Sequence, residues 1–125
     1  MESALEAGYR HIDTAYAYEN EHVIGKVLKK WIDGGKLKRE DLFIVTKLPI
    51  FGLRPAEVQQ YIDSSLEKLQ LSYVDLYLIH SPFGCFKVGD KLTEWPLDLN
   101  TDHLALWKVR KRSSYMINIL VITGF

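Results

Sequence analysis

The spacing of apolar residues divides the chain up to residue 80 into alternating extended and helical segments. Apolar side chains recur at helical spacing over residues 21–33 and 55–71, which predicts two amphipathic helices. Mostly apolar runs at residues 9–12, 42–45 and 74–79 predict short strands. Because strand and helix alternate, the pattern is typical of parallel βαβ units, and an α/β fold class is expected.

The pattern is less regular outside these segments. Residues 2–7 resemble the end of a helix, with a glycine directly after it as the stop. Pro55 is expected in the first turn of the helix that ends near residue 71. Residues 83–100 predict a long irregular segment, whereas residues 102–111 could begin a helix and residues 116–122 are expected to form a strand.

Composition narrows the classes of function. In this chain of 125 residues, 16 basic side chains balance 16 acidic ones, so neither a nucleic-acid nor a membrane partner is expected. The only cysteine, Cys85, cannot form an internal disulfide, which favours a reducing, cytoplasmic location. The longest apolar run, residues 116–122, is too short to span a bilayer. His11 and His80 have no second ligand cluster at metal spacing, so no metal site is expected.

Three ionisable residues follow successive predicted strands, directly or after one residue: Asp13, Lys47 and His80. The carboxyl ends of parallel strands lie at one edge of a sheet, where α/β proteins build active sites. Tyr18 lies in the loop after the first strand. An ammonium beside a phenol stabilises the phenolate, and a carboxylate can hold that ammonium in place. The four residues therefore predict a proton-transfer site, in which His80 gives a second hydrogen bond to a substrate oxygen.

Each of these residues also has an ordinary structural interpretation. Asp13 could be a turn or capping residue, Lys47 could be solvated, and His80 could satisfy backbone groups at a strand end. Tyr18 is one of seven tyrosines. The matching placement of three ionisable groups favours the catalytic interpretation. The sequence contains no G-x-G-x-x-G or Walker-type phosphate loop.

Three segments carry a resemblance to a known family. Residues 8–15 read Gly-Tyr-Arg-His-Ile-Asp-Thr-Ala and are followed by Glu21 and Gly25, while residues 43–48 and 75–80 supply two further strand motifs in the same order. Over about residues 2–108 the chain resembles the aldo-keto reductase family. This resemblance implies a (β/α)8 TIM-type barrel, NADPH as the hydride donor, and reduction of small-molecule aldehydes or ketones to alcohols.

The resemblance also implies a role for each candidate residue. Tyr18 would be the general acid that protonates the carbonyl oxygen, and Lys47 would favour loss of its proton. Asp13 would pair with Lys47 and approach the nicotinamide ribose, which makes it the candidate cofactor-binding residue. His80 would orient the carbonyl, so that His80 and Tyr18 both bind substrate. Where the family often has tryptophan after this histidine, Ser81 stands here, and it is expected to affect substrate choice.

The chain also departs from the family pattern. The family's opening strand and most of its first helix are not found, and the sequence diverges after residue 108. We therefore expect an incomplete barrel of three to four parallel strands with flanking helices in residues 1–108, a divergent tail in residues 109–125, and an incomplete cofactor site. The alternative is a non-enzymatic truncated isoform or fragment that acts through protein association, including self-association at open barrel edges. Related barrels also serve as potassium-channel subunits, but no residue favours that branch.

Overall fold

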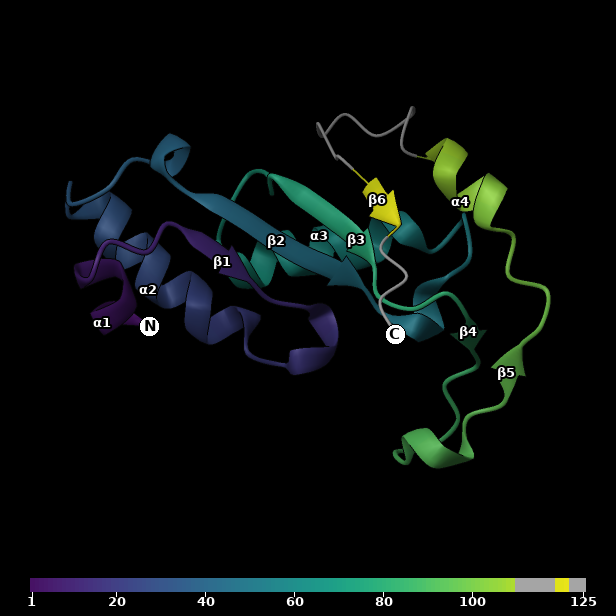
Figure 1. Ribbon diagram of the computed structural model, residues 1–125. Coiled ribbons are helices and arrows are strands. Elements are labelled where there is room, and N and C mark those ends of the chain that lie inside the picture. The colour runs from purple at the N-terminus through teal and green to yellow at the C-terminus, as the bar shows by residue number, and fades with distance from the viewer. Residues whose placement is uncertain (110–118, 122–125) are drawn as a thin grey trace.

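The fold is taken from a computed structural model, which describes residues 1–109 and 119–121 (Figure 1). The described helices are α1 (Glu2–Glu6), α2 (Glu21–Asp33), α3 (Val58–Leu69) and α4 (His103–Val109). The described strands are β1 (His11–Asp13), β2 (Phe43–Leu48), β3 (Leu76–Ile79), β4 (Gly84–Cys85), β5 (Leu97–Asp98) and β6 (Ile119–Val121). Short 3-10 turns occupy Tyr16–Tyr18, Arg39–Asp41, Ile50–Gly52 and Leu92–Glu94.

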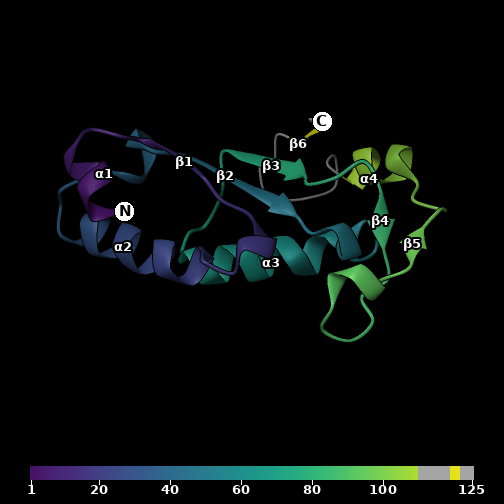
Figure 2. The same ribbon diagram turned by 60° about the horizontal axis from the view of Figure 1, so that its bottom comes forward.

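The main sheet is parallel and has the strand order β1-β2-β3-β6. Helices α2 and α3 lie side by side along one face of this sheet (Figure 2). The register is staggered: Asp13 pairs with Val45, and Lys47 pairs with Leu78. Residues two positions apart in a strand point to the same face. Lys47 lies two residues beyond Val45, the partner of Asp13, and His80 lies two residues beyond Leu78, the partner of Lys47. Asp13, Lys47 and His80 therefore belong to the same face of the sheet.

The opposite face of the sheet forms the core with the helices. Strand residues on that face include Ile44, Leu48, Tyr77 and Ile79, which are at most 3% exposed. They pack against the apolar stripes of α2 and α3, among them Leu28, Trp31, Val58, Ile62, Leu66 and Leu69. The two-residue alternation of β2 thus separates a core-facing set from the set that carries Lys47.

Gly25 sets the distance between the two helices. A Cβ at this position would lie 2.3 Å from the backbone oxygen of Lys68 and 2.6 Å from the carbonyl carbon of Leu69. These atoms belong to the last turn of α3 and cannot rotate away as a flexible side chain could. The absence of a side chain at Gly25 therefore allows α2 to approach the end of α3 closely.

The structure confirms the predicted alternation of strands and helices but changes several boundaries. Strand β2 continues to Leu48, so Lys47 lies within it rather than after it. The prediction for Pro55 is wrong, because α3 begins only at Val58. Hydrogen-bonded turns precede the helix, including a bond from the backbone nitrogen of Glu57 to the carbonyl of Arg54.

Three predictions concern the chain after residue 82, and the structure follows them to different extents. The segment 83–100 is not wholly irregular, since β4 and β5 pair as antiparallel strands within it. Helix α4 begins at His103, as the pattern from residue 102 suggests. Of the predicted strand 116–122, the structure describes residues 119–121, which pair in parallel with β3, and residues 116–118 and 122 lie outside the described residues.

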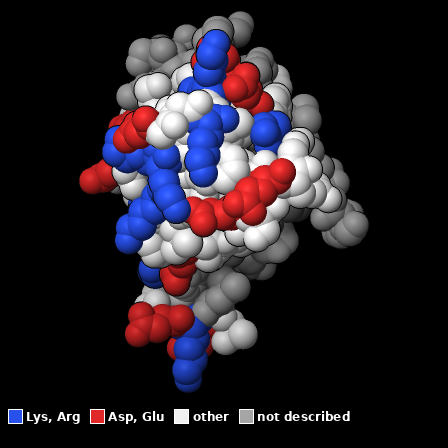
Figure 3. Space-filling view, turned by 90° about the vertical axis from the view of Figure 1, so that its left-hand side faces the viewer, with Lys and Arg blue, Asp and Glu red and all other residues white. Residues whose placement is uncertain are grey.

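Charged side chains of both signs are interspersed on the face seen in Figure 3. Around α1 and α2 they form exposed ion pairs, which include Lys30 with Glu2 at 2.7 Å and Lys29 with Asp33 at 2.8 Å. Exposed pairs of this kind contribute little to stability. Among the described residues, no helix has the length and apolar character that crossing a membrane requires.

Candidate functional site

Lys47 lies at the centre of the candidate site. Its side chain is 12% exposed, and its ammonium donates to the Asp13 Oδ1 atom. The same nitrogen donates to the backbone oxygen of Thr14 at 2.9 Å and to the Tyr18 hydroxyl oxygen at 3.4 Å. An ammonium removed from water in this way needs such acceptors. The ammonium of Lys47 on β2 thus contacts both the end of β1 and the loop that follows β1.

The loop that carries Tyr18 is short and closed by its own hydrogen bonds. The Thr14 hydroxyl donates to Asn20 Oδ1 at 2.7 Å, which joins the two ends of the loop. A 3-10 turn spans Tyr16–Tyr18, and Glu19 then takes a left-handed backbone conformation with φ of 55°. This reversal leads the chain into α2 at Glu21. Tyr18 remains 50% exposed, so its hydroxyl is open to a ligand.

His80 completes the group from the end of β3. Its backbone nitrogen donates to the carbonyl of Leu48 at 3.3 Å, which extends the pairing of β2 and β3 by one residue. Its ring lies edge-to-face with the ring of Tyr18, with centroids 5.5 Å apart. Burial lowers the pKa of His80, and the charge of Lys47 lowers it further, while Asp13 acts in the opposite direction. The imidazole is therefore neutral at pH 7 and can donate a hydrogen bond.

These causes predict how His80 titrates. In the wild-type chain, the midpoint for His80 protonation should lie below 6.5, as followed by NMR of the ring protons. The Lys47→Met variant should raise the midpoint, because a neighbouring positive charge is removed, and Asp13→Asn should lower it. Lys91→Met is the control, since Lys91 is exposed and pairs with Glu94. A midpoint that does not respond to Lys47→Met would contradict the geometry.

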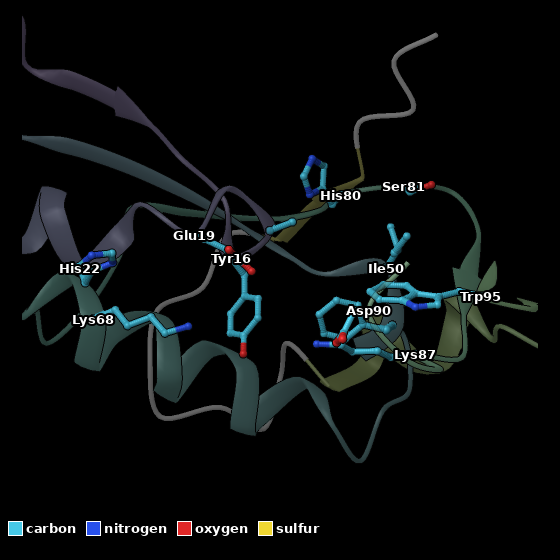
Figure 4. A pocket seen from close by; sticks show the side chains of 12 residues that line it. Tyr16, Glu19, His22, Ile50, Lys68, His80, Ser81, Lys87, Asp90 and Trp95 are labelled. Atoms are coloured by element: carbon cyan, nitrogen blue, oxygen red, sulfur yellow. The ribbon is translucent and has the colours of Figure 1, made fainter. Parts of the chain in front are cut away.

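A cavity of about 670 Å³ opens beside His80 (Figure 4). Its walls come from the Tyr18 loop with the start of α2, the segment after β2, the end of α3 and the chain between β3 and β5. The lining residues are Tyr16, Ala17, Glu19, His22, Ile50, Phe51, Lys68, His80, Ser81, Lys87, Asp90 and Trp95. Of the four predicted site residues, His80 lines this cavity, whereas Asp13, Tyr18 and Lys47 are not among its lining residues. The cavity is large enough for a small organic ligand.

Aromatic rings form much of the cavity wall. Phe51 and Trp95 pack edge-to-face with centroids 5.4 Å apart, and Tyr16 packs in the same way on Tyr61. The ammonium of Lys68 lies 3.8 Å from the centre of the Tyr16 ring, which is a favourable cation–π distance. Sequence patterns do not reveal this lining, because its members come from four separate segments. Of these lining residues, the sequence predicts only His80 in the site and Ser81 beside it.

The structure also contains a buried polar cluster that sequence reasoning missed. The Glu21 carboxylate is 1% exposed and accepts hydrogen bonds from Thr46 Oγ1 at 2.7 Å and Ser65 Oγ at 3.2 Å. The signal in the sequence was Thr46, a polar residue at a core-facing position of β2. No group of three or more His, Cys, Asp or Glu residues suited to a metal ion occurs in the described ranges.

The chain is similar to proteins of a known family. The model of the Aldo/keto reductase family matches residues 1–109. Aldo-keto reductase family 1 member C4 of Macaca fuscata fuscata is 45% identical over 116 aligned residues, which cover 87% of this chain and 35% of that protein. Member C13 of the same family from Mus musculus is 54% identical over 87 residues, with 70% of this chain and 27% of that protein covered.

A solved structure agrees with these relatives. The aldose reductase of Schistosoma japonicum superimposes with a TM-score of 0.86 and 38% identity, over 96% of this chain and 42% of that one. The chain thus spans about a third of the length of the curated relatives quoted and less than half of this structural neighbour.

The parallel sheet with helices on one face and ionisable groups at its carboxyl edge defines an α/β protein built as an incomplete (β/α)8 barrel. The matched region covers most of the sequence. The chain belongs to the aldo/keto reductase family, whose members are oxidoreductases.

Proposed function

We propose that the four residues Asp13, Tyr18, Lys47 and His80 form the proton-transfer site of an NADPH-dependent reductase that converts aldehydes or ketones to alcohols. The observation that carries this proposal is the position of the Lys47 ammonium, which contacts both the Asp13 carboxylate and the Tyr18 hydroxyl. The match to the family supports it. The substrate would be a small-molecule carbonyl compound that enters through the aromatic cavity.

In this proposal each of the four residues has its own role. Tyr18 donates its proton to the carbonyl oxygen, and the ammonium of Lys47 stabilises the phenolate that remains. Asp13 holds that ammonium. His80 donates a hydrogen bond to the same carbonyl oxygen and, because its lowered pKa keeps it neutral, it orients the carbonyl instead of protonating it. Ser81 in the cavity wall is proposed to influence which carbonyl compound fits.

The surroundings of Asp13 fit a ribose hydroxyl of NADPH. Its side chain is 52% exposed, and the hydrogen bond to Lys47 uses Oδ1. The other carboxylate oxygen is thus available to accept a hydrogen bond from a ribose hydroxyl. Asp13 would then hold the nicotinamide ribose of the cofactor. NADPH, when bound, supplies the hydride.

We expect the 125-residue chain to bind NADPH weakly, with a Kd above about 100 μM. Phosphate sites in barrels of this type lie near the last two strands, and this chain aligns with only 35% of the relative named member C4. Titration of NADPH fluorescence measures the affinity, and loss of NADPH absorbance with an aromatic aldehyde measures turnover. Turnover at high NADPH should fall strongly in Lys47→Met but not in Lys91→Met. Turnover that is absent, or equal in both variants, would contradict the proposed function.

The open edge of β1 favours a second candidate function, which is association with another chain. In the described residues β1 is the edge strand of its sheet. Phe43 on the neighbouring strand β2 is 45% exposed, and its ring contacts that of His11 on β1. Unpaired strand edges can pair with other chains. We expect light scattering to show a mass that rises with protein concentration. A monomer at all concentrations would remove the basis for this function.

A further inference from the structure

The buried Glu21 carboxylate has no role in the proton transfer proposed above. It is the first residue of α2 and is 1% exposed. Burying a carboxylate costs free energy unless hydrogen bonds replace its hydration. In the described part of the chain, two hydroxyl groups supply those bonds: Thr46 on β2 and Ser65 on α3. One side chain therefore joins α2, β2 and α3.

Stability alone does not explain such a cluster. A buried polar group that is replaced together with its partners by apolar groups of the same shape often leaves stability unchanged or higher. Tyr77, which is 1% exposed, belongs to the hydrophobic core that β2, α2 and α3 share. Burial and the nearby Glu21 both raise the pKa of Tyr77, so its phenol stays neutral.

The position of the cluster relative to the candidate site is informative. The four buried polar residues in the described part are Thr14, Glu21, Thr46 and Ser65. Thr14 and Glu21 flank the loop that carries Tyr18, and the Thr14 hydroxyl bonds to Asn20, the residue before Glu21. The loop is thus held by the partly buried Thr14–Asn20 hydrogen bond and, at its end, by the buried hydrogen bonds of Glu21.

Thr46 connects the cluster to Lys47. The two residues are neighbours in β2, and successive side chains of a strand point to opposite faces. Thr46 faces the helices and donates to Glu21, while Lys47 faces the candidate site and donates to Asp13. The bond on one face of β2 therefore fixes the backbone that carries the cation on the other face.

We propose that Glu21 is a positioning residue that, through Thr46 and Ser65, holds the Tyr18 loop and Lys47 in register with each other. This inference rests on the proposed function, because it assigns Glu21 to the same proton-transfer site. Glu21 itself touches neither the substrate nor the reacting atoms.

The test compares two substitutions of Thr46 in the full 125-residue chain. Thr46→Val keeps the shape and removes the hydroxyl, whereas Thr46→Ser keeps the hydroxyl. The readout is the NMR cross-relaxation between the rings of Tyr18 and His80, whose centroids lie 5.5 Å apart. We expect this signal to be retained in Thr46→Ser and lost in Thr46→Val. Leu66→Ala removes buried apolar volume in α3 but leaves the hydroxyl of the neighbouring Ser65 in place, so it should lower stability and retain the signal.

Each outcome decides the inference. A folded Thr46→Val chain that retains the Tyr18–His80 signal overturns it, and so does loss of the signal in Leu66→Ala. If Thr46→Val does not fold, Glu21→Met removes both acceptors at similar side-chain length and gives the same comparison. If neither folds under conditions in which Leu66→Ala does, the cluster only stabilises the fold, and positioning is refuted.

Turnover separates this inference from the proposed function. A wild-type chain that shows the ring–ring signal but reduces no carbonyl compound would refute the proposed function and leave the positioning inference to stand or fall on the NMR result. Conversely, turnover that is equal in wild type and Thr46→Val would refute the positioning role while the reductase function remains supported.

Discussion

Replacing Tyr18 by phenylalanine is expected to lower the rate of carbonyl reduction by about 10²- to 10⁴-fold, which is the usual contribution of a general acid. The substitution removes the hydroxyl that lies 3.4 Å from the Lys47 ammonium but keeps the ring that packs against His80. The cavity is therefore unchanged, and the loss should be in kcat rather than in KM. Steady-state kinetics at NADPH concentrations that compensate for weak binding measure the effect.

Tyr9→Phe is the matched control. Tyr9 is 66% exposed and precedes β1, so removal of its hydroxyl should leave the rate unchanged. If the Tyr18→Phe chain retained the wild-type rate, a group other than Tyr18 would have to be the general acid. His80 would then be the first candidate, and the rate should rise as the pH falls through its lowered pKa, because only the protonated imidazole could donate the proton.

Gly25→Ala is expected to have the largest effect on stability. The new Cβ would lie 2.3 Å from the backbone oxygen of Lys68, so α2 and α3 must move apart. Overpacking of this kind costs about 3 kcal/mol in the free energy of unfolding. Urea denaturation followed by circular dichroism measures the change.

The sign of the Gly25 result is diagnostic. Within an uncrowded helix, alanine is more favourable than glycine by about 1 kcal/mol. An increase in stability would therefore show that α2 and α3 do not approach as closely as described. Lys26→Ala, at an exposed position of the same helix, is the control and should change stability little.

The strand-end residues could be predicted because strong constraints place them. Each apolar run is compact enough to mark a strand, and in parallel sheets the carboxyl ends meet at one edge. The structure places Asp13, Tyr18, Lys47 and His80 together, as the sequence predicts. Their catalytic roles remain a proposal.

Other features depend on packing that no local pattern encodes. The Glu21 cluster unites residues 25 and 44 positions apart, and the cavity wall comes from four segments. Proline suits a first helical turn, which predicts Pro55 at the start of α3, but a hydrogen-bonded turn from Arg54 to Glu57 occupies that segment instead. The helix propensity of proline permits Pro55 in a first turn, but it does not determine where α3 begins.

The staggered register has a consequence for how such a chain can vary. Asp13 and Lys47 are 34 positions apart, yet their contact depends on the pairing of Asp13 with Val45 and not on that separation. Insertions in the connections between strands would leave the contact intact. A single residue inserted in β2 between Val45 and Lys47 would turn the lysine toward the helices. The connections between strands can therefore change length during evolution, whereas the number of residues between Val45 and Lys47 within β2 must be kept.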